Sequence, residues 1–508
     1  METYLHPLHL IYLHTAINMN TNTKTETKVH NSHKNKPPLP LIAIFIVILI
    51  FSAVTIYIVT SSPINSTIHV RNEKELTNAI NNAPTTKPTT IILNKDIKLK
   101  NPLLIPNNKN ITLTSNTKFY HTKFYKLIGT NKQQQKETIT IEEGGVLRLS
   151  GIIVTHTKNA NGTGVTVNEG GKLDMTNGEI SDNHAYAVYT ILEDNKWTSS
   201  GGSGGGVYNL GVFTMSGGTI SDNTANPGDA IFVAEKWQIS DSFGGGVYNL
   251  GVFEMSGGAI LGNDAYGDGG GVFVAESGFF NMSGDACIAS NGASAGGGVC
   301  VQGVFVMSGG KIFDNAASFG GGVRVDTGGT FNMTGNAEIT NNIVGREGGG
   351  VYVGSYFNLH GSTFYMSDNA IIANNKADQG GGGVYVYNGQ FELSDGKIRG
   401  NTACDGGGIC NYGNVTMISG EISNNTASAG GGGVFNYNGP PKWTEVPEGS
   451  FVYSFFKMAG GEITNNTADN GGGIFDCLGT FSKIGGGVIA NNKAANVGND
   501  ICRPDDLS

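Results

Sequence analysis

The stretch GGGVYNLGVFTMSGGTISDNTA, from Gly204 to Ala225, is repeated almost unchanged as GGGVYNLGVFEMSGGAILGNDA, from Gly244 to Ala265. A triple glycine, a Phe-x-Met step and an Ile-x-x-Asn step stand at the same offsets in both stretches. One catalytic site does not need such a repetition, whereas a solenoid of stacked repeats does. The two stretches therefore direct the search for the fold to further copies of the same pattern.

The Ile-x-x-Asn step recurs eleven times along the chain. Its asparagines are Asn183, Asn223, Asn263, Asn291, Asn315, Asn342, Asn375, Asn401, Asn425, Asn466 and Asn492. An alanine stands two residues after the asparagine in ten of the eleven copies, and a triple glycine followed by Val or Ile opens ten units. The gaps run from 24 residues (Asn291 to Asn315) to 41 residues (Asn425 to Asn466). Periods of this length indicate a solenoid.

The pattern inside each unit is typical of short β-strands. Helical repeats need amphipathic runs of good helix formers, which the triple glycines exclude. Runs such as GGVYN, VFTMS and GGTISDN instead alternate between two sides of a strand. The side chains expected to point inward in one unit are Val207, Phe213, Met215 and Ile220. Three short strands and their turns in a period of about 25 residues predict an all-β fold, a right-handed parallel β-helix solenoid.

The repeated asparagine is expected to have a structural role. Coils of such a solenoid stack about 4.8 Å apart, so that like residues lie above one another. An asparagine at a turn tolerates a left-handed backbone and can hydrogen-bond its counterpart on the next coil. The eleven asparagines are therefore predicted to form a ladder that holds the stack together and takes no part in chemistry.

One apolar segment predicts where the protein resides. Residues 41–60, LIAIFIVILIFSAVTIYIVT, carry no charge and are long enough to cross a bilayer as a transmembrane helix. Four lysines shortly before this segment favour a cytoplasmic, disordered leader over residues 1–40, with the rest of the chain outside the cell. The sequence predicts a single-pass plasma-membrane protein with an extracellular C-terminal region, or a secreted protein if residues 41–60 are a cleaved signal peptide.

The extracellular part is expected to form one domain with two sections. Residues 64–150 lack the repeat and are assigned to an N-terminal cap and the first, irregular coils. Val70–Ala83 is predicted to be an amphipathic helix that plugs the end of the stack, as solenoid ends require. Its apolar face consists of Leu76, Ala79 and Ile80. Residues 151–508 are assigned to the repetitive β-helix.

Composition argues against several kinds of partner. The net charge is −9 and only 14% of residues are charged, so no basic surface is available to neutralise phosphates. A nucleic-acid partner is therefore not expected. No cofactor motif and no compact set of metal ligands stands out in the sequence, and neither a cofactor nor a metal is predicted.

The phrase GGGVYN, followed by FTMSGG and the Ile-x-x-Asn-x-Ala step, resembles the repeats of polymorphic outer-membrane protein type and the adhesin-like right-handed β-helix proteins of bacterial and archaeal surfaces. The stretch NEKELTNAINNA is similar to the capped beginning of the pectate-lyase-like superfamily, with its pectin-lyase fold. The resemblance covers residues 64–502. It implies display at the cell surface and adhesive or structural roles, with residues 41–60 as the tether.

Aromatic side chains mark the candidate binding surface. If the Val after each triple glycine faces inward, the aromatic residue that follows faces outward, and stacking creates a stripe suited to sugar rings or another protein, or simply to cross-coil packing. The candidates in this stripe are Tyr208, Tyr248, Phe273, Tyr352 and Tyr385. Inserted loops in the longest units each carry a Trp, which either contacts a ligand or covers the coil. These are Trp197, Trp237 and Trp443.

Two pairs of carboxylates are the candidates for catalysis. Asp182 and Asp222 share a register on successive units, as do Glu421 and Glu462. Such a pair is an acid/base couple, part of a Ca²⁺ site, or a pair of acids on a solvated turn. No base accompanies them, and catalysis is not expected. The sequence predicts a tethered adhesin-like or structural protein that binds glycans or other surface molecules; the alternative is an extracellular polysaccharide lyase or glycoside hydrolase on the same fold.

Overall fold

The computed structural model describes the chain over residues 66–116, 124–131, 136–191, 197–228, 231–233, 236–238, 241–355, 361–439 and 453–507. Two compact units divide the chain, Met1–Pro63 and Ile64–Ser508. Residues 1–40 and 41–60 lie outside the described part, so the leader and the membrane anchor stay predictions. Within the described ranges, no helix is both long enough and apolar enough to span a bilayer.

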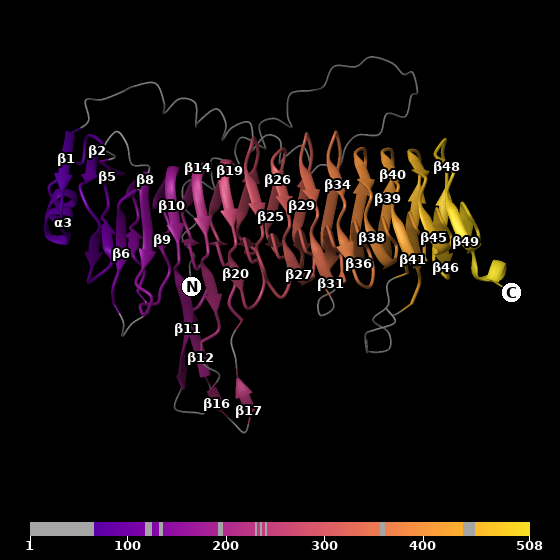
Figure 1. Ribbon diagram of the computed structural model, residues 1–508, viewed down its shortest axis with the longest axis horizontal. Coiled ribbons are helices and arrows are strands. Elements are labelled where there is room, and N and C mark those ends of the chain that lie inside the picture. Colours follow the sequence, from indigo (N-terminus) through magenta and orange to yellow (C-terminus); the bar gives the residue numbers. More distant parts are fainter. Residues whose placement is uncertain are drawn as a thin grey trace, which may run out of the picture. The chain divides into compact units, whose positions relative to one another are not determined.

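The second unit is a stack of parallel coils (Figure 1). Within the stack, most strands of a coil pair in parallel with the corresponding strands of the coil before and of the coil after. Phe213, for example, lies in register between Leu173 and Phe253. An all-β chain with long parallel sheets of this kind fits a β-helix, and the repeat spacing in the sequence corresponds to one coil.

A first column of strands, the glycine face, follows the triple glycines. Its strands are β4 (Leu103–Ile105), β7 (Ile139–Ile141), β9 (Val165–Val167), β13 (Val207–Asn209), β18 (Val247–Asn249), β21 (Val272–Val274), β24 (Val299–Val301), β28 (Val323–Val325), β32 (Val351–Gly354), β36 (Val384–Leu393), β39 (Ile409–Met417), β42 (Val434–Tyr437), β46 (Ile474–Cys477) and β50 (Ile501–Cys502). The first residue of each strand from β4 to β46 is buried in the core. β36 and β39 continue into the next column.

A second column, the phenylalanine face, carries the Phe-x-Met step. Its other strands are β1 (Ser66–Val70), β2 (Thr89–Leu93), β5 (Asn110–Ser115), β8 (Val146–His156), β10 (Lys172–Ser181), β14 (Val212–Ser221), β19 (Val252–Leu261), β22 (Phe279–Met282), β25 (Val304–Met307), β29 (Thr330–Met333), β33 (Thr363–Met366), β43 (Phe455–Met458) and β47 (Thr480–Lys483). Its phenylalanines stack on one another with ring centroids 4.5 Å apart for Phe213 and Phe253 and 4.8 Å apart for Phe305 and Phe331.

A third column, the isoleucine face, carries the Ile of the Ile-x-x-Asn step. It uses the second halves of β8, β10, β14 and β19 together with β3 (Ile97–Leu99), β6 (Lys126–Gly129), β23 (Cys287–Ala289), β26 (Lys311–Phe313), β30 (Glu338–Thr340), β34 (Ile371–Ala373), β37 (Lys397–Arg399), β40 (Glu421–Ser423), β44 (Glu462–Thr464) and β48 (Val488–Ala490). The predicted inward residues Val207, Phe213, Met215 and Ile220 are each no more than 1% exposed. Alternation along the strands thus identified the core correctly.

A fourth column, the alanine face, follows the asparagine. Its strands are β11 (His184–Ile191), β15 (Thr224–Asn226), β20 (Asp264–Ala265), β27 (Ala316–Phe319), β31 (Ile343–Glu347), β35 (Lys376–Ala377), β38 (Thr402–Asp405), β41 (Thr426–Gly430), β45 (Thr467–Asn470) and β49 (Lys493–Val497). β11 forms a hairpin with β12 (Trp197–Gly201), and β16 (Ile231–Val233) forms one with β17 (Lys236–Gln238). Figure 1 shows both hairpins extending away from the coils.

The asparagines line the corner between the isoleucine and alanine faces. Each side-chain amide from Asn183 to Asn466 donates to the Oδ1 of the next asparagine over 2.8 to 3.0 Å. The backbone N–H of each donates to the same oxygen, which fixes the direction of every side chain. Asn492 donates to Asp500, so a carboxylate ends the ladder.

The triple glycines form a corner where neighbouring coils approach closely. At Gly383 a Cβ would lie 2.6 Å from the carbonyl oxygen of Gly408 and 2.8 Å from a methyl carbon of Ile398. Gly381, the first glycine of the same triplet, has a φ of +66°, a backbone conformation that residues with a side chain rarely adopt. Glycine is required at this corner because both the space and the backbone angle exclude a side chain.

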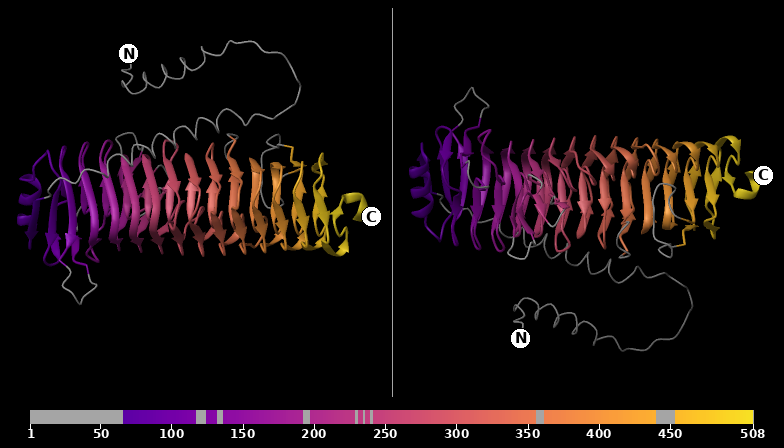
Figure 2. Two further views of the ribbon diagram at one scale, coloured as in Figure 1. Left: turned by 90° about the horizontal axis from the view of Figure 1, so that it is seen from above. Right: turned by 90° about the horizontal axis from the view of Figure 1, so that it is seen from below.

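Helix α3 (Glu73–Asn81) covers the N-terminal end of the stack (Figure 2). Asn72 caps it by accepting a hydrogen bond from the backbone N–H of Glu75 over 3.0 Å. Its buried residues are Leu76, Ala79 and Ile80, the apolar face that the sequence indicated. At the opposite end of the stack, the short 3₁₀ helix η1 (Pro504–Leu507) follows β50.

Candidate functional site

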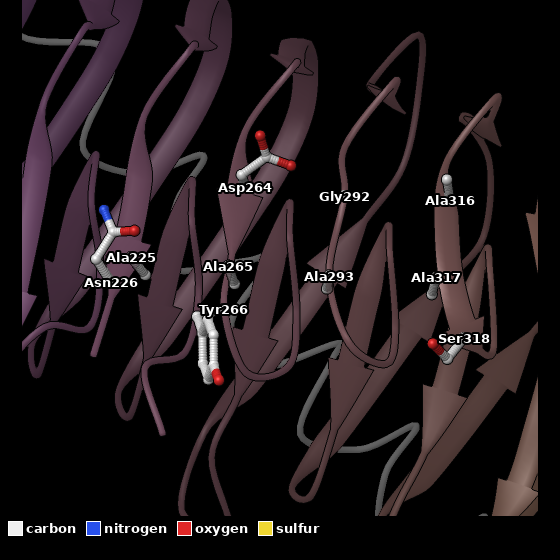
Figure 3. A pocket seen from close by; sticks show the side chains of 10 residues that line it. All are labelled: Ala225, Asn226, Asp264, Ala265, Tyr266, Gly292, Ala293, Ala316, Ala317 and Ser318. Carbon is white, nitrogen blue, oxygen red and sulfur yellow. The ribbon is translucent and has the colours of Figure 1, made fainter. Parts of the chain in front are cut away.

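A groove of about 460 Å³ lies on the outside of the alanine face. It crosses four successive coils and is lined by Ala225, Asn226, Asp264, Ala265, Tyr266, Gly292, Ala293, Ala316, Ala317 and Ser318 (Figure 3). We call it the alanine groove. With coils about 4.8 Å apart, it extends roughly 14 Å along the stack, which suits an extended ligand rather than a compact one.

Small residues form the floor of the alanine groove. Ala225 and Ala265 pair in register and are 0% and 6% exposed. In the next two coils Gly292 bridges to Asp264 on one side and to Ala316 on the other. A Cβ on Gly292 would lie 2.4 Å from a carboxylate oxygen of Asp264, so this glycine leaves room for that side chain. The hollow therefore results from the alanine that follows each ladder asparagine.

Polar and aromatic groups stand at the margins of the groove. Figure 3 shows Asp264 and Tyr266 on opposite sides of Ala265. Tyr266 is 55% exposed and presents a free ring face, while desolvation raises the pKa of Asp264 above its ordinary value. Asn226 donates to the Thr224 hydroxyl over 2.8 Å. The ten lining residues include one carboxylate and no cation. This set matches uncharged hydroxyl-bearing ligands better than anions.

Strands on either side set the ends of the groove. On the N-terminal side, Tyr186 of the β11–β12 hairpin pairs with Asn226, and on the C-terminal side Ala316 pairs with Ile343, which is 55% exposed. Two of the inserted tryptophans belong to strands of the hairpins. Trp197 pairs with Ile191 between β11 and β12, and Trp237 pairs with Phe232 between β16 and β17. Their side chains and all of Trp443 lie outside the described part of the chain, so their roles stay predictions.

The aromatic stripe is largely covered rather than exposed. Phe273, Tyr352 and Tyr385 are 2%, 1% and 2% exposed, which corrects the expectation that they face a ligand. Two phenylalanines that precede a triple glycine cover this column: the ring centroid of Phe243 lies 4.6 Å from that of Phe273, and the ring centroid of Phe319 lies 5.9 Å from that of Tyr352. These side chains point away from the central core, as the alternation along the strands predicted. On the outside of the glycine face they pack with other apolar side chains in a second layer, which buries them.

The first two members of the stripe are only half buried. Tyr208 and Tyr248 stack with ring centroids 5.1 Å apart, and Tyr248 stacks in turn on Phe273 at 5.3 Å. Burial raises the pKa of both phenols. Neither tyrosine lines the alanine groove. Cross-coil stacking therefore accounts for their contacts.

The carboxylate pairs lie in register but on solvated positions. Asp182 and Asp222 have φ values of +53° and +56°, the left-handed turn conformation that Asp tolerates, and both are exposed. Glu421 pairs in register with Glu462, accepts a hydrogen bond from Ser423, and forms an ion pair of 3.3 Å with Lys397. The bond from Ser423 lowers the pKa of Glu421. These contacts explain the acids without a ligand.

The structure brings together one charged group that spacing did not reveal. Arg324 lies 3.5 Å from Asp268 and 3.3 Å from Asp326, and all three side chains are at most 18% exposed. Burial raises the pKa of Asp268 to about 6, and the attraction of Arg324 offsets only part of this. Arg324 occupies the aromatic column between Cys300 and Tyr352. An alignment of the units on their triple glycines shows Arg324 as a charged residue at a position that is aromatic in most units.

No protein family, curated protein or solved structure matches the chain. The resemblance to adhesin-like and pectin-lyase-like proteins thus rests on the repeat pattern, and what the fold supports is the coarser statement of a parallel, repetitive β-structure. Among the described residues, no group of three or more His, Cys, Asp or Glu side chains is placed to hold a metal ion.

Proposed function

We propose that this chain is a cell-surface-tethered, adhesin-like β-helix of right-handed sense, without catalytic activity, that binds neutral glycans along the alanine groove. Residues 41–60 would serve as the tether to the plasma membrane, with the coils outside the cell. The repeat pattern and its resemblance to surface adhesins support display, and the long shallow groove supports an extended ligand. The resemblance of the stretch NEKELTNAINNA to the beginning of pectin-lyase-like proteins favours carbohydrate as the class of ligand.

The observation that carries the proposal is the exposed ring of Tyr266 beside an uncharged floor. An aromatic ring packs against the apolar face of a sugar, while Asn226, Asp264 and Ser318 offer hydrogen bonds to hydroxyl groups. The groove crosses four coils along the direction of stacking, and this length suits an extended polymer. The absence of a cation among the ten lining residues argues against acidic polymers.

The test uses residues 64–508, which form one compact unit with its own core. This protein is incubated with a panel of soluble and insoluble polysaccharides, and both co-sedimentation and the release of new reducing ends are recorded. We expect binding to at least one neutral glycan without new ends. Tyr266→Ala should weaken that binding about ten-fold, as loss of about 1.4 kcal/mol does.

Tyr453→Ala provides the matched control, because Tyr453 is 70% exposed but lies far along the chain from the groove. It should bind as the wild type does. Equal binding by the wild type and Tyr266→Ala would remove the groove from the proposal, and failure to bind any glycan would remove the ligand class.

The tether is tested separately in cells. Deleting residues 41–60 should leave the protein unable to stay with the membrane fraction, since no other segment in the described ranges is an apolar helix of sufficient length. Retention of the deleted form in the membrane fraction would contradict the anchor. Cleavage after residue 60 in the wild type, read by N-terminal sequencing, would instead assign the segment as a signal peptide.

The alternative function, a polysaccharide lyase or glycoside hydrolase, draws on the Asp268–Arg324–Asp326 group. Carboxylates beside a cationic side chain are chemical groups that such enzymes use, and burial raises the pKa of Asp268 to about 6. Appearance of new reducing ends or unsaturated products in the glycan panel would favour this function. Asp268→Asn and Asp326→Asn would then be the first variants to assay.

A further inference from the structure

The ladder places the sequence neighbours of its asparagines on the surface. Asn425 and Asn466 belong to successive coils, share a hydrogen bond of the ladder, and are each 0% exposed. The residues directly before and after them are exposed, and these are Asn424, Thr426, Asn465 and Thr467. In both coils an asparagine and the threonine two residues after it therefore face the solvent at the corner between the isoleucine and alanine faces.

Both stretches read Asn-Asn-Thr and match the acceptor motif for N-glycosylation, an Asn followed two residues later by Ser or Thr. The enzyme that transfers the glycan recognises the hydroxyl-bearing residue together with the amide. The chain has further copies of the motif, and the eight together begin at Asn65, Asn110, Asn161, Asn281, Asn332, Asn414, Asn424 and Asn465. Accessibility in the structure distinguishes between these copies.

Most of the other copies are less accessible. Four of them lie on strands of the phenylalanine face with their asparagines only half exposed, namely Asn110, Asn281, Asn332 and Asn414. Asn161 is exposed, but the hydroxyl residue of its motif, Thr163, is half-buried. Asn65 lies outside the described part of the chain. Among the described copies, only those at Asn424 and Asn465 expose both the asparagine and the threonine.

The two accessible copies have the same backbone geometry and lie next to each other. Asn424 and Asn465 have φ values of +55° and +57°. The backbone N–H of Asn424 donates to the carbonyl oxygen of Thr464 over 3.2 Å, and Thr426 pairs in register with Thr467. The two acceptor positions are therefore on adjacent coils, about 4.8 Å apart along the stack.

The side-chain amide of Asn424 can carry a sugar and keep its contact in the fold. It has two N–H bonds and donates to the hydroxyl of Ser423 over 3.2 Å. In the transfer, a bond forms between Nδ2 and the anomeric carbon of the sugar, the bond from that carbon to a lipid diphosphate breaks, and one amide proton is released. The second N–H bond remains for Ser423.

We propose that Asn424 and Asn465 are N-glycosylation sites, with an oligosaccharide on a lipid diphosphate as the donor. This rests on the proposed function, because the transfer requires that the coils are exported. Four steps of the ladder separate Asn315, beside the alanine groove, from Asn425. The attachment points are thus roughly 19 Å from that end of the groove, at about 4.8 Å for each coil.

The experiment uses the full chain, expressed in a host that N-glycosylates its exported proteins. Tandem mass spectrometry of intact glycopeptides should locate a glycan at Asn424 and another at Asn465. Thr426→Val should abolish the first glycan and Thr467→Val the second, because each removes a hydroxyl and keeps the shape of the side chain. Both threonines are exposed, so the variants are expected to fold, with unchanged circular dichroism spectra.

Thr402→Val is the matched control. Thr402 is exposed and pairs in register with Thr426, but Gly400 stands at the acceptor position of its coil, and both glycans should remain. Ile343→Thr provides the opposite test. Asn341 has the same turn conformation, with a φ of +58°, and the substitution completes the motif, so a new glycan should appear there.

Absence of a glycan from Asn424 or from Asn465 in the wild type overturns the assignment of that residue. A glycan that persists in the corresponding Thr→Val variant overturns it as well, and so does an unmodified Asn341 in Ile343→Thr. A membrane-impermeant amine reagent, applied to intact cells, shows independently whether the coils lie outside. Labelled coils without glycans would refute the glycosylation sites alone, whereas unlabelled coils without glycans would refute surface display as well.

Discussion

The coils before residue 168 and those after residue 172 have the same course but different sequences. In the early coils the phenylalanine face is aliphatic, with Ile111 and Leu147 in register, whereas the later coils stack phenylalanine on phenylalanine. The early coils also lack triple glycines and ladder asparagines. Both regions bury their inward residues completely, at 0% for Leu147 and for Phe253.

The comparison shows that the interactions needed to form a coil differ from the interactions found at the corners of the later coils. Stacked apolar columns suffice for a parallel coil, because the early region has little else. The asparagine ladder and the glycine corner occur only in the repeated coils. The ladder provides hydrogen-bond partners for buried amides. The glycine corner allows an outer apolar layer to lie over the glycine face. The repeats should therefore be sensitive to changes that the early coils would tolerate.

The largest expected effect is from breaking the ladder at its middle. Asn342 is 0% exposed and its amide donates to Asn375, to the Ile312 carbonyl and to the Thr340 carbonyl. Asn342→Leu removes these three hydrogen bonds, and it also removes the oxygen that accepts from the backbone N–H and the side-chain amide of Asn315. The free energy of unfolding should fall by about 3 kcal/mol or more, measured by urea denaturation.

Asn341→Gly is the control for that substitution. Asn341 is the exposed neighbour, with a φ of +58° that glycine adopts readily. Its replacement should change the stability by no more than about 0.5 kcal/mol. If Asn342→Leu were equally mild, the ladder would not be a source of stability.

The next effect is expected at the glycine corner. Gly383→Ala places a methyl group 2.6 Å from a carbonyl oxygen of the next coil and should cost about 1 to 3 kcal/mol in urea denaturation. Gly345→Ala is the comparison, because no atom lies within 4 Å of its Cβ position. That variant should be neutral or slightly stabilised. Equal stability of the two variants would refute the close approach of the coils.

A smaller effect tests the phenylalanine stack against the aliphatic column of the early coils. Phe331 lies between Phe305 and Phe364, with ring centroids 4.8 and 4.9 Å away. Phe331→Leu should cost about 1 kcal/mol, because leucine already serves in the same column at Leu173. Phe481→Leu, in the partly buried last coil, should cost less. A loss above about 3 kcal/mol at Phe331 would show that the stack is not interchangeable with aliphatic packing.

The last expected effect concerns the pH dependence of stability in the outer layer of the repeats. The pKa of Asp268 in the folded chain is about 6, above its ordinary 3.8, because burial outweighs the attraction of Arg324, while Asp326 and Asp241 add repulsion. The folded state thus holds the proton more tightly, and this stabilisation is complete below about pH 4 and lost as pH rises to about 6. Melting temperatures between pH 4 and 7 should show this loss in the wild type and not in Asp268→Asn.

Asp505→Asn is the control for the pH experiment, since Asp505 is an exposed residue of η1. It should keep the pH dependence of the wild type. The same slope in Asp268→Asn and in the wild type would place the titration at another residue.

The core and the ladder could be predicted because each depends on a position within the repeat. Val207, Phe213 and Ile220 alternate with polar residues, and the asparagines keep a constant offset from an inward Ile. When the coils stack, residues at the same position in successive repeats therefore lie next to one another. The cap could be predicted as well, because Leu76 and Ile80 fall on one helical face.

The candidate site could not be predicted in the same way. The alanine groove depends on which margin residues are large. The position of Tyr266, three residues after the ladder asparagine, holds a tyrosine in two units only, at Tyr186 and Tyr266. Alternation shows that Tyr352 leaves the core, but it does not show that an outer layer covers it. The contact of Arg324 with Asp268 spans 56 residues and skips a coil, and no local pattern encodes it.

The direction of the ladder has a consequence for biosynthesis. Every ladder asparagine from Asn183 onwards donates from its backbone N–H and its side-chain amide to an oxygen that is later in the chain, while the amide also donates to an earlier carbonyl oxygen; Asp500 is the last of the later acceptors. A chain leaving the ribosome N-terminus first therefore always carries, at its newest coil, amide protons whose acceptor has not yet been translated. Each ladder asparagine up to Asn466 would therefore complete its hydrogen bonds only when the next coil has been made, and Asn492 would complete them with Asp500.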